Sequence, residues 1–143
     1  MRQYRFEDMK TGMTERFVVT VGAEQQEAFF ALTGDSNPLH RDADFAKKRG
    51  FEDRVVYGML ASAYYSTLAG VYLPGENCLI NECKVTYYQP VYPGDVLTVE
   101  GVVSDVREST RRVKIAGKMT RADGTVVNTA VIAVSFTGER SMV

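Results

Sequence analysis

The sequence predicts an α+β domain in which a curled, mostly antiparallel sheet wraps around one central apolar helix. The first observation behind this prediction is the stretch Gly58 to Gly70, GMLASAYYSTLAG, which has helical composition and no charge on any face. A helix without a polar face is a buried helix, and this one is too short to cross a bilayer. The second observation is a set of four long downstream segments rich in β-branched residues, which are typical of strands. The strands would supply the cover that the helix needs.

The elements before the central helix are short. Arg16–Val21 predicts the first strand, and the following AEQQEAFFALTG predicts a helix whose Glu and Gln residues suit its first turn and which ends at Gly34. The next stretch, DSNPLH, predicts a loop, because the residue before a proline is held out of the α region. Asp42 then resembles the N-cap of a second short helix, which ends at Gly50.

The elements after the central helix are strands. The four predicted strands are Cys78–Tyr88, Val96–Val106, Arg112–Thr120 and Thr125–Phe136. The third alternates in polarity, and its inward-facing residues are Val113, Ile115, Gly117 and Met119. Asp123-Gly124 is a strong signal for a tight hairpin between the last two strands. Consecutive antiparallel strands curled around one helix are the architecture of the hot-dog fold.

The length and charge of the chain limit the classes of function that it can have. The chain has 143 residues, enough for one domain with a real core, and Lys and Arg number 17 against 18 for Asp and Glu. A charge balance this close to zero argues against a general electrostatic hold on nucleic acid or acidic membranes. No apolar run reaches the roughly 18 residues that span a bilayer, and the N-terminus is too polar for a signal peptide. We therefore expect neither a nucleic-acid nor a membrane partner.

The two cysteines, Cys78 and Cys83, lie in one predicted strand. Their spacing places them on opposite faces of that strand, where they cannot easily pair with each other. A reduced, cytoplasmic protein is the simplest interpretation.

The stretch GDSNPLH, Gly34 to His40, holds a carboxylate and the only histidine of the chain. A plain structural explanation is that Asp35 accepts backbone N–H groups in an Asx-turn and that His40 is a surface residue. The chemical alternative is that the carboxylate and a neutral imidazole, held on one rigid turn, share a water molecule and activate it. Two such residues without a third ligand nearby fall short of a zinc site, so we expect no metal.

A family resemblance begins at this loop. The run GDSNPLHRDADFA resembles the signature of the (R)-specific enoyl-CoA hydratases, the MaoC-like or hydratase-2 group, which have the hot-dog fold. The stretch VYGMLASAYYSTLAGVYLPG is similar to the central helix of that family, and YYQPVYPGD to the segment before the next strand. Matching spans run from about Arg16 to Phe136, and we expect residues 1–143 to form a single MaoC-like domain. One departure is Tyr57, which stands where many members carry a histidine.

The resemblance implies a site and a reaction. It implies that Asp35 and His40 are a catalytic dyad, that the N–H of Gly58 is the oxyanion donor, that Ser66 lines the substrate pocket and that Asn37 braces the loop beside it. The alternative for Ser66 is a helix serine that donates to the backbone carbonyl four residues earlier. The substrate would be a trans-2-enoyl-CoA and the product an (R)-3-hydroxyacyl-CoA. No cofactor is implied, because coenzyme A enters only as part of the substrate. A homodimer, or a higher oligomer built from it, is expected for the family, and edge pairing would also remove an aggregation hazard.

Three alternatives are weighed against this interpretation. A thioesterase of the same fold is disfavoured, because many place a catalytic carboxylate on or next to the central helix and Gly58–Gly70 contains none. A dehydratase acting on acyl-carrier-protein substrates shares the chemistry, since hydration is reversible. A non-catalytic acyl-thioester binding protein is the alternative outside the enzymes, and the presence of both Asp35 and His40 argues against it.

Overall fold

The computed structural model describes residues 1–138, and the expected domain end at residue 143 lies outside the described residues. The elements in chain order are a 3₁₀ turn (Phe6–Asp8), β1 (Thr14–Val21), α1 (Ala23–Thr33), α2 (Pro38–Arg41), α3 (Ala43–Lys48), α4 (Gly58–Thr67), a π-helical turn (Leu68–Tyr72), β2 (Cys78–Tyr87), β3 (Asp95–Arg107), β4 (Arg112–Arg121) and β5 (Val126–Phe136). Each predicted helix and strand is confirmed to within a few residues. The exception is α2, a single turn inside the expected loop, which begins at Pro38 because proline suits the first helical position.

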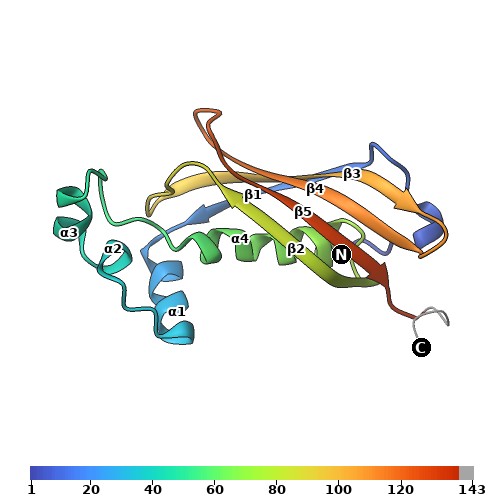
Figure 1. The fold of residues 1–143 in the computed structure, drawn as a ribbon, viewed down its shortest axis with the longest axis horizontal. Helices are drawn as coiled ribbons and strands as arrows, with labels where there is room; N and C mark the ends of the chain where they lie inside the picture. The colour runs from blue at the N-terminus through green and yellow to red at the C-terminus, as the bar shows by residue number, and fades with distance from the viewer. Residues whose placement is uncertain (139–143) are drawn as a thin grey trace.

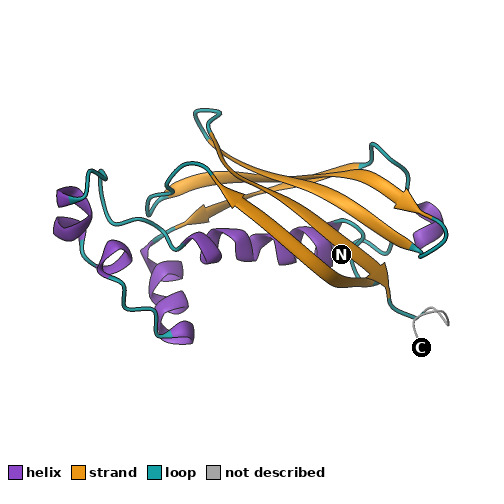
Figure 2. Cartoon of the chain, in the orientation of Figure 1, coloured by secondary structure: helices purple, strands orange, loops and turns teal. Residues whose placement is uncertain are grey.

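The five strands form one antiparallel sheet in the order β1-β3-β4-β5-β2. Figures 1 and 2 show the sheet as a curved layer with α4 running along one of its faces. Strands β1 and β2 are its two edges. The hot-dog architecture expected from the sequence is therefore present.

The contact between α4 and the sheet depends on a glycine. The inward residues of β4 are buried as the alternation predicts, Gly117 among them. A Cβ atom at Gly117 would lie 2.5 Å from Cε1 of Tyr65, so only glycine lets that ring approach the strand this closely. The Tyr65 hydroxyl donates to Oδ1 of Asn128, and both side chains are buried. This polar pair is satisfied inside the core, as buried polar groups must be.

Residues 1–138 cover only one side of α4. Ala61 and Tyr65 are buried against the sheet, whereas Met59 is 73% exposed and Ala63 and Ser66 are exposed as well. The charge-free helix is thus half covered, and its other side has the composition of a surface that another protein layer would bury.

Helices α1, α2 and α3 form a lobe beyond one end of the sheet, next to the start of α4 (Figure 1). This lobe carries the loop with Asp35 and brings it beside Tyr57, the residue that precedes α4. Within residues 1–138, no helix is both long and apolar enough to cross a membrane.

Candidate active site

The loop between α1 and α2 is held in one conformation by its own hydrogen bonds. Gly34 ends α1 with φ of 71°, in the left-handed region that favours glycine. Asp35 Oδ1 then accepts a hydrogen bond from the backbone N–H of Asn37 at 3.0 Å. Asn37 Oδ1 accepts one from the N–H of Leu39, also at 3.0 Å, and so caps α2. The Asx-turn of the plain structural explanation is present, and it fixes the backbone that carries Asp35 and His40.

The imidazole of His40 has a defined tautomer when neutral. Its Nδ1 lies 2.7 Å from the backbone carbonyl oxygen of Val55. A carbonyl can only accept, so Nδ1 carries the proton and Nε2 is left as an acceptor. A second bond, from the N–H of Val55 to the carbonyl of Leu39 at 3.0 Å, ties the same two segments together.

Tyr57 contacts both residues of the expected dyad. Its ring lies against the imidazole of His40, with centroids 4.3 Å apart and planes tilted by 30°. Its hydroxyl donates to the backbone carbonyl of Asp35. Tyr57 is 2% exposed, and burial raises the pKa of its hydroxyl, so the group remains a donor at neutral pH. The departure from the family pattern at position 57 is therefore part of the support of the site.

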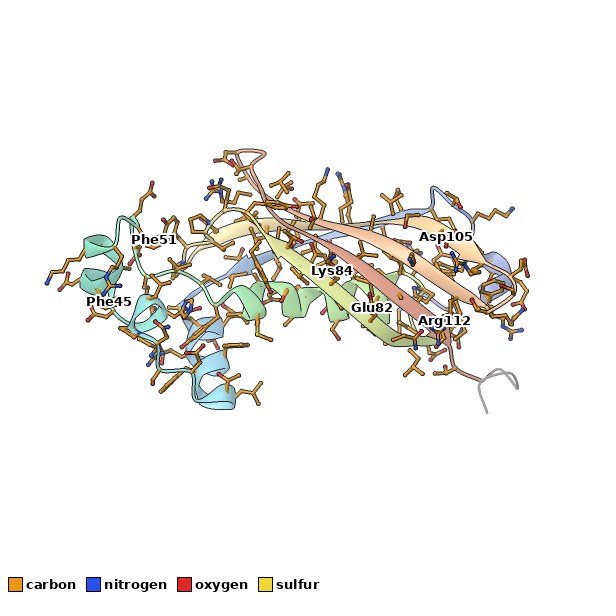
Figure 3. All side chains as sticks on the ribbon, in the orientation of Figure 1. Phe45, Phe51, Glu82, Lys84, Asp105 and Arg112 are labelled. Carbon is orange, nitrogen blue, oxygen red and sulfur yellow. The ribbon has the colours of Figure 1, made fainter. Side chains whose placement is uncertain are left out.

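A cavity of about 420 Å³ brings the expected dyad together with the start of α4. Its lining residues are Phe29, Thr33, Asp35, His40, Tyr57, Gly58, Met59 and Tyr87. A second cavity, of about 270 Å³, shares three of them with the first: His40, Gly58 and Tyr87. The rest of its wall is mainly apolar and includes Val56, Ala61, Val91 and Phe51, which lies on the loop after α3 (Figure 3). Gly58 and Tyr87 therefore border both cavities.

Gly58 lies where an anion is stabilised best on α4. As the first residue of the helix it has no intrahelical acceptor for its N–H, and Tyr57 provides no side-chain cap. The positive end of the helix dipole adds to this preference for negative charge. A Cβ atom at Gly58 would lie 3.1 Å from Cε1 of Tyr87, so glycine also leaves room for that ring beside the backbone.

Ion pairs fix the outer side of the lobe. Arg41 Nη1 lies 2.7 Å from Oε1 of Glu27, and Arg54 Nη1 lies 3.5 Å from the same oxygen. The hydrogen bond from Arg41 lowers the pKa of Glu27. The Arg41 guanidinium also lies over the ring of Phe30, 3.9 Å from its centroid. These contacts join α1, α2 and the segment before α4.

Two of the expected site residues do not line either cavity. Asn37 is exposed and caps α2, which agrees with a bracing role. Ser66 lies on the exposed side of α4, about 12 Å along the helix from Gly58 at 1.5 Å per residue. Ser62, one turn after Gly58, is the serine beside the cavities, because its Oγ accepts the Tyr87 hydroxyl at 2.8 Å. Residues 1–138 contain no group of three His, Cys, Asp or Glu side chains that could hold a metal ion.

Sequence reasoning missed Gln26. It lies within the Glu and Gln run that suits a first helical turn, yet its side chain is fully buried and contacts the backbone beside His40 and Tyr57. No pattern in the sequence distinguishes it from Gln25, which caps the helix by accepting the N–H of Gly22.

Comparison with known proteins gives matches along most of the chain. The family model described as MaoC like domain matches residues 5–125. The chain is 36% identical over 102 residues to a protein of Aeromonas caviae named (R)-specific enoyl-CoA hydratase, a match that covers 71% of this chain and 76% of that protein. A solved structure of an A. caviae (R)-hydratase involved in PHA biosynthesis superposes with a TM-score of 0.86 and 31% identity, covering 90% of this chain and 98% of the other. A mitochondrial 3-hydroxyacyl-[acyl-carrier-protein] dehydratase of Solanum lycopersicum is 30% identical over 122 residues, covering 83% of this chain and 72% of that protein.

Proposed function

The chain belongs to the MaoC-like domain family of hydratases and dehydratases, and on this ground we propose that it adds water reversibly to trans-2-enoyl-CoA, giving (R)-3-hydroxyacyl-CoA. The observation that carries the proposal is that Asp35, His40 and Gly58 line one cavity. The similarity to a protein named for this reaction supports the choice of substrate.

In the proposed reaction one water molecule lies between Asp35 and His40 and donates a hydrogen bond to each. Asp35 Oδ1 is engaged by the N–H of Asn37, which leaves Oδ2 for the water. His40 accepts through Nε2, because Nδ1 carries the proton bound to the Val55 carbonyl. A water that donates both of its hydrogens keeps a lone pair for the β carbon of the enoyl group.

Addition proceeds in two steps on one face of the substrate, first at the β carbon and then at the α carbon. The water oxygen bonds to the β carbon as Asp35 takes one water proton, and the π electrons move to the thioester carbonyl. The enolate oxygen accepts a hydrogen bond from the N–H of Gly58 at the positive end of α4. The α carbon then takes a proton back from the dyad, which restores the Asp35 carboxylate and completes syn addition. His40 orients the water and assists the proton transfer.

The remaining site residues receive supporting roles. Asn37 braces the dyad loop through its cap of α2. Ser66 is exposed in the single chain, so a role for it at a pocket requires a second copy to cover that side of α4. The apolar wall of the second cavity, with Val56, Ala61 and Val91, suits the acyl chain.

The second candidate function is dehydration of a 3-hydroxyacyl group carried by acyl-carrier protein. The similarity to a dehydratase named for carrier-protein substrates favours it. The chemistry at Asp35 and His40 would be the same, because the reaction is reversible. Matched crotonyl-CoA and crotonyl-carrier-protein substrates distinguish the two candidates by their kcat/KM values.

The test of the proposal is hydration of crotonyl-CoA by the purified protein, followed as loss of the conjugated enoyl absorbance, with the stereochemistry of the product determined. We expect the (R)-alcohol from the wild type and a loss of at least about 10³-fold in kcat for Asp35→Asn. Asp44→Asn is the matched control, because Asp44 is an exposed carboxylate in α3 away from both cavities. Normal turnover by Asp35→Asn would rule out the mechanism. Binding of crotonyl-CoA and crotonyl-carrier protein without turnover of either would favour the non-catalytic binding protein.

We further propose that the chain forms a homodimer through the edge of β2. That strand is an edge of the sheet, and all of its residues except Cys78 and Val85 are exposed. An exposed edge with apolar side chains pairs with other chains unless it is covered. Leu79 is 47% exposed there, and the uncovered side of α4 at Met59 is exposed as well. A second copy of this chain would cover both surfaces at once.

A further inference from the structure

Gln26 is a fully buried polar side chain whose amide is completely hydrogen-bonded. Its Nε2 donates to the backbone carbonyls of His40 and of Val55, each at 3.0 Å. Its Oε1 accepts the backbone N–H of Tyr57 at 3.2 Å. The side chain extends from α1 and is inaccessible to solvent, so these three hydrogen bonds account for its presence in the interior.

The three partners of Gln26 belong to the parts of the site that must act together. His40 carries the imidazole, and Val55 provides the carbonyl that accepts its Nδ1–H. Tyr57 is the residue before Gly58, whose N–H is the proposed oxyanion donor. The Val55 carbonyl accepts from both Gln26 and His40, so the amide holds the same oxygen that determines which ring nitrogen is protonated.

We propose that Gln26 is a positioning residue for the reaction. It holds the Val55 carbonyl against Nδ1 of His40, so that Nε2 stays unprotonated and faces the water. It also fixes the position of the Gly58 amide relative to that imidazole. The effect on turnover rests on the proposed function. The effect on the tautomer of His40 does not, because it is a property of the free protein.

The geometry requires an amide at this position. Methionine has a similar size but neither donates nor accepts in the same way, so it would leave the His40 carbonyl and the Tyr57 N–H without their partner. Glutamate could still accept from Tyr57, but an ionised carboxylate would face two carbonyl oxygens. Gln26→Met therefore removes the hydrogen bonds at nearly constant volume, and Gln26→Glu replaces two of them with repulsive contacts between oxygen atoms.

Because His40 is the only histidine, nitrogen NMR of the imidazole reports this site alone. In the wild type, at a pH where the ring is neutral, we expect a single species protonated at Nδ1. In Gln26→Met we expect a mixture that includes a substantial Nε2-protonated population. Gln25→Met is the matched control, since Gln25 only caps α1 at Gly22, and it should keep the wild-type spectrum.

The kinetic measurement separates positioning from a general loss of structure. With crotonyl-CoA we expect Gln26→Met to lower kcat by about tenfold or more while KM changes by less than about threefold, because the interaction matters when proton transfer occurs. Gln26→Glu should lower kcat at least as much. Gln25→Met, checked by circular dichroism together with the others, should keep the wild-type kcat.

The outcomes distinguish this inference from the proposed function. A wild-type imidazole protonated at Nε2 overturns the inference even if no Gln26 variant folds. A folded Gln26→Met with a pure Nδ1 tautomer and unchanged kcat also overturns it. A wild type that hydrates no enoyl thioester contradicts the proposed function, whereas the tautomer result in wild type and variants then still tests the role of Gln26.

Discussion

The hydroxyl of Tyr57 donates a hydrogen bond to the backbone carbonyl of Asp35, 22 residues earlier in the chain. The ring of the same tyrosine lies against the imidazole of His40. One buried side chain therefore holds the carboxylate loop and the imidazole at a fixed spacing, and we expect the spacing to depend on the hydroxyl.

The variant Tyr57→Phe keeps the ring contact with His40 and removes the hydroxyl, with its bond to the Asp35 carbonyl and its interaction with the Arg41 guanidinium. We expect kcat for crotonyl-CoA to fall by about three- to tenfold, and the free energy of unfolding to fall by about 1 kcal/mol, as for loss of one hydrogen bond. The loss of enoyl absorbance over time measures kcat, and urea unfolding measures the free energy of unfolding.

Tyr64→Phe is the control for Tyr57→Phe. Tyr64 is also in the region of α4 and partly buried, but it lines neither cavity that contains His40. Its variant should match the wild type in kcat. Equal kcat values for Tyr57→Phe and Tyr64→Phe would mean that the bond to Asp35 does not position the dyad.

A second prediction concerns the room beside Gly58. In Gly58→Ala the new methyl group would lie 3.1 Å from Cε1 of Tyr87, so this ring, which lines both cavities, must shift by a few tenths of an ångström. We expect kcat/KM for crotonyl-CoA to fall by about tenfold or more, with a larger loss for longer acyl chains. Steady-state kinetics over a series of chain lengths measures this.

The variant Tyr87→Leu tests whether the effect at Gly58 is steric. It removes the ring that the alanine methyl would meet, along with the hydrogen bond from Tyr87 to Ser62. In the Tyr87→Leu background we expect Gly58→Ala to lower kcat/KM by a smaller factor than it does in the wild-type background. An equal loss of kcat/KM in both backgrounds would show that the methyl group acts on something other than Tyr87.

The fold could be predicted because its signals are periodic or local. The alternation of β4 predicts its buried face. The position of Asp42 predicts an N-cap, and its side chain accepts the N–H groups of Asp44 and Phe45. The charge-free composition of Gly58–Gly70 correctly indicates a helix on the sheet. It does not indicate which side the sheet covers, because a helix without charged residues has no charged face to orient it.

The support of the site could not be predicted because it depends on contacts between distant segments. Gln25 and Gln26 are adjacent and identical in type, yet one caps a helix end and the other lies in the interior. The bonds of Gln26 reach residues 14 and 29 positions away, and the bond of Tyr57 to Asp35 spans 22. Only the fold brings these groups together. The same holds for Ser66, whose side of α4 depends on the packing of the helix.

A third prediction concerns stability at alkaline pH. Burial raises the pKa of the Cys78 thiol to about 11. The unfolded thiol releases its proton nearer its usual pKa of about 8.5, so above that pH the folded chain binds more protons than the unfolded chain and stability falls as pH rises toward 11. We expect urea midpoints of the reduced wild type to fall more steeply between pH 8.5 and about 10.5 than those of Cys78→Ala.

The comparison of wild type with Cys78→Ala isolates the contribution of Cys78 to the pH dependence of stability. Burial also raises the pKa values of Tyr57 and Tyr65, but these residues contribute equally to both. The difference in midpoint between wild type and Cys78→Ala should be constant below about pH 8 and shrink above it. A difference that stays constant to pH 10.5 would contradict a raised pKa at Cys78.

The last prediction gives the register of the proposed dimer. Glu82, Cys83 and Lys84 lie in the middle of the β2 edge, and Figure 3 shows Glu82 and Lys84 on that strand. Lys84 is opposite Val131, which is 43% exposed, whereas Cys83 is opposite the buried Ile132 and so faces the α4 side. If two copies of β2 pair antiparallel about Cys83, each Glu82 lies opposite Lys84 of the other copy, and the two Cys83 residues face each other. This register makes the edge self-complementary in charge.

Charge reversal and crosslinking test this register independently. Lys84→Glu would place like charges opposite each other at two symmetric positions, and we expect its dimer dissociation constant to rise by about tenfold or more. Adding Glu82→Lys in the same chain restores opposite charges and should restore the dimer, as measured by analytical ultracentrifugation. Mild oxidation should give a covalent dimer that Cys83→Ser abolishes and Cys78→Ser does not. A stable dimer that Lys84→Glu does not weaken and that oxidation does not crosslink through Cys83 would show that the contact lies elsewhere on the chain. Both measurements depend only on which residues of β2 face each other across the two-fold axis.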